Sequence, residues 1–158
     1  MNSNWARRRE AQRLAAESDA RAELAVINDL GETVDIHPLR KKEVAERIGL
    51  CFDRLIYNNN KVKLSPVVLS AEVQNDKVVL TLDQPVQAGT LNDFELAGAD
   101  GRFVNAEAEV TPANPNVITL RAAVTAPNRV RYTWKDNPLR ANVRSLSGLP
   151  MSSFEMNF

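Results

Sequence analysis

The sequence has a single cysteine, Cys51, and a single histidine, His37, among its 158 residues. One cysteine cannot form an internal disulfide. Cys51 falls within a helical pattern, so we interpret it as an inert buried thiol rather than a nucleophile. A zinc site would need carboxylates beside these two residues, and none shows metal-ligand spacing. With no glycine-rich phosphate loop and no G-x-S-x-G serine motif, the sequence predicts neither a metal nor a cofactor.

The chain also lacks an excess of either charge and any long apolar run. Its formal net charge is zero, and neither half is strongly biased, so no basic face for nucleic acid is expected. No apolar run approaches the roughly 20 residues of a membrane span. The arginines in "MNSNWARRREAQ" are not followed by the apolar stretch of a secretory signal. A composition of 44% apolar and 25% charged residues is typical of a globular protein.

The first sixty residues have an α/β pattern. Residues 5–16 are rich in good helix formers, and "ELAVIND" at residues 23–29 predicts a short buried strand. A loop with Gly31 follows, and a helix is expected from about Pro38, because proline is favoured at the first helical position. Apolar residues at helical spacing form one stripe on that helix: Val44, Ile48, Phe52 and Leu55.

From residue 61 onward the pattern alternates as in strands. Six short strand-like runs separated by turn residues predict an antiparallel sandwich or half-barrel: "VVLSAEV", "KVVLTLD", "DFELAG", "RFVNAEAEV", "NVITLRA" and "NRVRYTW". In the last run Trp134 shares its face with Val130 and Tyr132, so we expect its ring in the core rather than on the surface as a sugar platform. The apolar residues of the tail predict that it packs along the β layer.

His37 is expected between the strand and the helix, at the strand's carboxyl end. Ligands bind at this edge of open α/β sheets, and a histidine there can act as a general base held by Asp35 or Glu32. The alternative is structural: His37 caps the helix and Asp35 favours its positive end. Spacing alone favours the structural alternative, because one D-x-H without a nucleophile motif is a weak signal.

Several segments together resemble the sialate O-acetylesterases, which are SGNH-type carbohydrate esterases. These segments are "WARRREAQRLA", "AVINDLGETVDIHPLRKKEVAERIGL", "FELAGADGRFVNAEAEV", "VRYTWKDNP" and "GLPMSSF", and they span nearly the whole chain. The resemblance implies an α+β protein of two parts. Residues 1–60 would be the C-terminal part of an SGNH domain, with one strand, two helices and His37. Residues 61–158 would be a β-sandwich-like domain with a packed irregular tail.

The resemblance also implies a chemistry, in which a serine attacks an O-acetyl ester on a sugar and a histidine acts as base. His37 matches the family's catalytic histidine, and Asp35 is the nearby acid. The wider SGNH group places its acid three residues before the histidine, where this chain has Val34. Asn28 is a second departure, since relatives more often have Thr-Ile-Asp before the D-L-G segment.

The serine, glycine and asparagine motifs of this family lie in segments that precede the matching region. We therefore expect the chain to be the C-terminal portion of a carbohydrate O-acetylesterase. Its expected partners are an O-acetylated sugar and the missing N-terminal esterase segment. Two alternatives remain open, a non-catalytic β module that binds carbohydrate or a partner, and an inactive fragment. Family members are commonly secreted, periplasmic or lysosomal.

Overall fold

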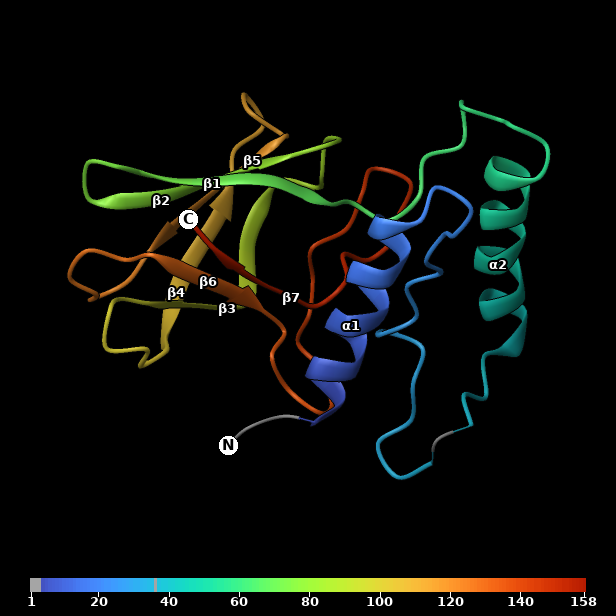
Figure 1. The fold of residues 1–158 in the computed structure, drawn as a ribbon, viewed down its shortest axis with the longest axis horizontal. Helices are drawn as coiled ribbons and strands as arrows, with labels where there is room; N and C mark the ends of the chain where they lie inside the picture. Colours follow the sequence, from blue (N-terminus) through green and yellow to red (C-terminus); the bar gives the residue numbers. More distant parts are fainter. Residues whose placement is uncertain (1–3, 36) are drawn as a thin grey trace.

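The computed structural model describes residues 4–35 and 37–158; Ile36 of the D-I-H-P motif lies outside them. Two helices, α1 (Asn4–Ser18) and α2 (Lys41–Leu55), precede all the strands. The strands are β1 (Val68–Gln74), β2 (Lys77–Leu82), β3 (Gly89–Ala97), β4 (Val104–Val110), β5 (Val117–Arg121), β6 (Arg129–Tyr132) and β7 (Phe154–Asn157). Figure 1 shows α1 between the strands and α2.

The seven strands form one antiparallel sheet in the order β1-β2-β5-β4-β3-β6-β7. Every strand contributes to a single buried core, from Val68 on one edge strand to Phe154 on the other. One sheet can surround a common core only if it curls, so the architecture is a near-barrel. The predicted α+β class and antiparallel β half are confirmed. Of the two predicted architectures, the half-barrel is closer than the sandwich, because the strands form one continuous sheet instead of two stacked sheets.

The irregular tail packs into this core, as expected. Val143, Met151 and Phe154 are almost completely buried in it. The tail also forms β7, which the sequence analysis missed, and β7 pairs with β6 in a register that sets Phe154 beside Tyr132. The rings of these two residues lie 6.2 Å apart between centroids. The tail is therefore an integral part of the β layer.

The core position expected for Trp134 is wrong. Thr133 has a φ of 48°, in the left-handed region, which breaks the strand alternation directly after β6. Thr133 is fully buried instead, with its hydroxyl 2.7 Å from that of Ser153. Trp134 is displaced to the outer side, where the Arg131 guanidinium lies 5.9 Å from its ring centroid.

The α/β half departs from the prediction in two places. Residues 23–29 form no strand, and none of the described strands pairs with them. Their polar groups are bound instead by side chains and loops: Arg47 donates to the Val26 carbonyl, and Asn28 donates to the Met151 carbonyl. The second helix begins at Lys41 rather than at Pro38, because Arg40, with φ −79° and ψ 58°, is not helical.

The apolar stripe of α2 is largely open to solvent. No described residue of α2 is buried, although Val44 and Leu55 are partly covered. Ile48 and Phe52 are 44% and 58% exposed. This helix therefore lacks the packed layer that its pattern requires. Among the described residues, no helix is both long and apolar enough to cross a membrane.

Candidate functional site

His37 and Asp35 contact each other in an exposed loop between residue 29 and α2. Asp35 Oδ1 accepts a hydrogen bond from the His37 backbone N–H at 2.8 Å, which closes an Asx turn. The same oxygen lies 2.9 Å from His37 Nδ1. The histidine side chain is 77% exposed and that of Asp35 is 56% exposed. The two predicted site residues are thus brought together by local geometry.

The structural alternative for this pair, a helix cap, is wrong. The residue at the N-cap of α2 is Arg40, and no side chain in the described part of the protein caps this end of the helix. His37 lies before that position and Asp35 lies further away.

The pair has the arrangement that a general base needs at one ring nitrogen. The backbone N–H of His37, and then its ring, hold the pKa of Asp35 below its ordinary value, so this carboxylate is ionised near neutrality. An ionised carboxylate accepts the Nδ1–H of a neutral imidazole and thereby fixes its tautomer. In that tautomer the lone pair is on Nε2, the atom that a general base uses. Among the described residues, Asp35 is the only hydrogen-bond partner of the His37 ring.

The other residues considered for this site do not reach His37. Glu32 is exposed and forms no hydrogen bond or ion pair within the described part of the chain. Val34, at the usual acid position, is 98% exposed and has no proton to exchange. Cys51 is partly buried, and this burial is the main cause that raises the pKa of its thiol. An un-ionised, partly covered thiol is a poor nucleophile, in line with the inert interpretation.

A groove of about 550 Å³ lies beside this loop and includes Asp35 in its wall. Its opposite wall comes from the first turns of α1, with Trp5 and Arg8, and from the corner at Asp136 and Asn137. The Arg8 guanidinium lies 5.2 Å from the Trp5 ring centroid. The proximity of these residues could not be predicted, because nothing in a single sequence relates the start of α1 to a corner 131 positions later. The volume is in the range of small-molecule sites.

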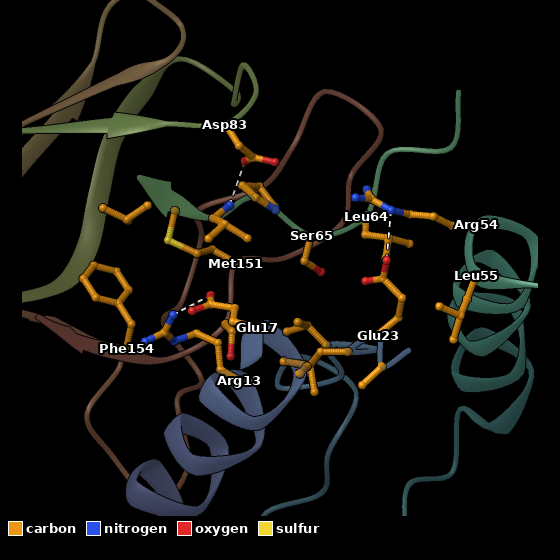
Figure 2. Close-up of a pocket in the computed structure, with 18 of the residues that line it drawn as sticks. Arg13, Glu17, Glu23, Arg54, Leu55, Leu64, Ser65, Asp83, Met151 and Phe154 are labelled. Atoms are coloured by element: carbon orange, nitrogen blue, oxygen red, sulfur yellow. Dashed lines mark hydrogen bonds and ion pairs between the residues drawn. The ribbon is translucent and has the colours of Figure 1, made fainter. Parts of the chain in front are cut away.

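A second groove, of about 600 Å³, lies away from His37, between the end of α1, the end of α2 and β7 (Figure 2). Four of its charged side chains form two ion pairs, with Arg13 at 2.5 Å from Glu17 and Arg54 at 2.9 Å from Glu23. It contains no histidine. In the described part of the chain, no group of three or more His, Cys, Asp or Glu residues is arranged to hold a metal ion.

No family model matches the sequence, and no curated protein matches it. Among solved structures, the chain is similar to the crystal structure of a novel carbohydrate acetylesterase from Xanthomonas citri. The two are 36% identical with a TM-score of 0.77 over 84% of this chain. The match covers 32% of the Xanthomonas chain, so this sequence spans about a third of that protein's length. In fold and in sequence, the chain is therefore related to a carbohydrate acetylesterase.

Proposed function

We propose that the chain is the C-terminal portion of an SGNH-type carbohydrate O-acetylesterase. Residues 1–60 would complete the esterase domain and carry His37, and residues 61–158 would form the attached β module. The substrate would be a sugar with an O-acetyl ester, such as an O-acetylated sialic acid. The similarity to the Xanthomonas acetylesterase supports the reaction class, and the D-I-H-P segment supports the sialate family.

The observation that carries this proposal is the contact between His37 Nδ1 and Asp35 Oδ1 at 2.9 Å. Nε2 has no hydrogen-bond partner among the described residues, and Asp35 lies in the wall of a ligand-sized groove. In the proposed reaction a serine from a segment outside this sequence attacks the acetyl carbon. Nε2 takes the serine proton and gives it to the departing sugar oxygen, which leaves as the free sugar hydroxyl and an acetyl-serine. Nε2 then takes a proton from a water that attacks the acetyl carbon, and it returns this proton to the serine oxygen as acetate leaves. Asp35 stabilises the imidazolium that forms in each half of the reaction.

The open face of α2 fits a chain that works with a further esterase segment. Ile48 and Phe52 are large apolar side chains left largely in water. Burying each one fully would be worth about 1.5–3 kcal/mol. A segment that covers them would gain this energy and would bring its serine to the same half of the molecule as His37.

Acetate release from O-acetylated sialic acid and from an aryl acetate tests the proposal. The chain alone should release no more acetate than its His37→Ala variant, and activity should appear when a serine-bearing segment encoded next to it is added. Turnover by the chain alone that disappears on mutating one of its own serines would overturn the assignment to a C-terminal portion. No activity in the mixture would indicate an inactive fragment.

One observation favours a second candidate function, a carbohydrate-binding β module. Trp134 lies outside the core on the outer face of the sheet, near Arg131. Aromatic rings at such positions can stack on a pyranose. Retention of the chain on a glycan column that is lost in Trp134→Ala, while the variant stays folded at the temperature of the assay, would favour this candidate. No retention would eliminate it.

A further inference from the structure

The loop that carries Asp35 and His37 is closed at its base by one carboxylate, Asp29. Arg47 of α2 binds this carboxylate with both terminal nitrogens, at 2.5 Å to Oδ1 and 3.0 Å to Oδ2. Arg40, at the far end of the loop, donates to the Asp29 backbone carbonyl. The two ends of the loop are therefore joined at a single residue.

Asp29 also joins the loop to the β layer. Arg144 of the tail donates to Asp29 Oδ2 at 2.9 Å, and the same nitrogen donates to the Gly148 carbonyl at 2.9 Å. The tail is held in turn, since Gln87 donates its backbone N–H to the Arg144 carbonyl. A second link lies further along the loop, where the Asn137 side chain donates to the Thr33 hydroxyl at 3.1 Å.

This network is shielded, unlike the other charges around the loop. The side chains of Arg47 and Asp29 are 13% and 12% exposed, and that of Arg144 is 31% exposed. Burial raises the pKa of Asp29, but the hydrogen bonds and charges of Arg47 and Arg144 outweigh burial and leave this pKa below its ordinary value. The carboxylate is thus ionised at neutral pH and bound by two guanidinium groups in a partly dry site, where such bonds are strong.

We propose that Asp29 is a positioning residue for the catalytic loop: through Arg47 it closes the loop, and through Arg144 it lets the β layer hold His37 in place. The β module would then support the esterase site directly, besides any role in binding sugar. This inference rests on the proposed function of His37. Without the network, the exposed loop would have no charged link to the β layer, and the Asp35–His37 geometry would be populated for only part of the time.

Nuclear magnetic resonance on the ¹⁵N-labelled full chain tests this directly. The variants are Asp29→Asn, Arg144→Gln and the conservative Arg144→Lys. The matched control is Arg131→Gln, which removes the Arg131–Glu95 pair, a similarly shielded ion pair within the β layer that does not touch the loop. Two quantities are measured: backbone order in residues 30–35 and 37–40, and the pH dependence of the His37 amide shift, which follows ionisation of Asp35 through their hydrogen bond.

Asp29→Asn and Arg144→Gln should lower the order parameters of the loop from about 0.85 to below about 0.6. They should also reduce the pH-dependent shift of the His37 amide by about half or more, while strand amides keep their order. Arg144→Lys should recover part of both signals, and Arg131→Gln should change neither. A purely structural role would lower the melting temperature without these local changes.

A loop that stays ordered in folded Asp29→Asn, with an unchanged His37 amide profile, would overturn the proposal. If Asp29→Asn does not fold, Arg144→Gln decides alone, because Arg144 lies at the more exposed end of the network. None of these measurements requires catalysis. Failure of the esterase assignment would instead appear as unaltered acetate release when His37→Ala is introduced into the assembled esterase, so the two ideas fail separately.

Discussion

Replacing Tyr132 by phenylalanine removes one oxygen atom from the centre of the β layer. The ring is fully buried, with its centroid 4.6 Å from that of Phe94. Its hydroxyl oxygen accepts the backbone N–H of Val143 at 3.1 Å, in a buried position. This bond fixes the start of the tail segment whose next residue is Arg144, which reaches Asp29.

The magnitude follows from what the change leaves behind. Phenylalanine keeps the ring contacts, so the hydrophobic contribution is nearly unchanged. The Val143 N–H loses its acceptor inside the protein, where an unsatisfied donor costs about 1–3 kcal/mol. We therefore expect the free energy of unfolding to fall by about 2 kcal/mol. For a chain of this size, that corresponds to a decrease in melting temperature of about 4–8 °C.

Near-ultraviolet circular dichroism during heating, with urea titration at 25 °C, measures this loss. Amide hydrogen exchange at Val143 should accelerate more than exchange in β2 or β5, since the damage begins at the tail. The order of the His37 loop should also fall slightly through Arg144. A variant that melts within about 1 °C of the parent, with Val143 equally protected, would refute the reasoning.

Three further results are expected. Burial raises the pKa of Asp29, but Arg47 and Arg144 lower it by more, so the folded-state pKa lies below the ordinary value of 3.8. The ionised Asp29 therefore contributes its full stabilisation above pH 3.8, and this stabilisation is lost as the pH falls through the lower folded-state pKa. Urea unfolding from pH 6 to pH 2 should show this loss in the parent and not in Asp29→Asn. The exposed apolar side chains of α2 should make the isolated chain self-associate at high concentration in analytical ultracentrifugation. Phe52→Ser should reduce this self-association and leave the melting of the β layer unchanged, whereas a large drop in melting temperature would mean that this face is covered. Trp134→Ala should cost about 1 kcal/mol in urea titration, well below the 3–5 kcal/mol of a core aromatic, and a core-sized loss would contradict its outer position.

Much of the β layer could be predicted from the sequence, because alternation reports directly which side chains face the core. In β5 the buried residues Ile118 and Leu120 fall two apart, as the strand pattern requires. The alternation pattern failed at Trp134, because the left-handed φ of Thr133 turns the next side chain to the opposite face of the sheet. Threonine rarely adopts this conformation, so the sequence does not indicate it. β7 was missed because its four residues do not belong to a longer alternating run, whereas the equally short β6 lies within one.

The α/β half was less predictable for a different reason. A buried strand is stable only beside other strands, and residues 23–29 have no such neighbour among those described. The contact between Asp35 and His37 could be foreseen, because a separation of two residues fixes it locally. The link from Asp29 to Arg144 spans 115 positions, and no local pattern in one sequence encodes such a pair.

The most direct test of the account is the rate of acetate release by the assembled esterase with His37 replaced by alanine. Removing the base should reduce kcat by up to about a millionfold, with KM little changed, as for other serine hydrolases that lose their histidine. Added imidazole should restore part of the rate of His37→Ala, because the cavity left by the side chain can take up the free ring. Near-normal acetate release by His37→Ala would contradict the central claim that this histidine is the general base.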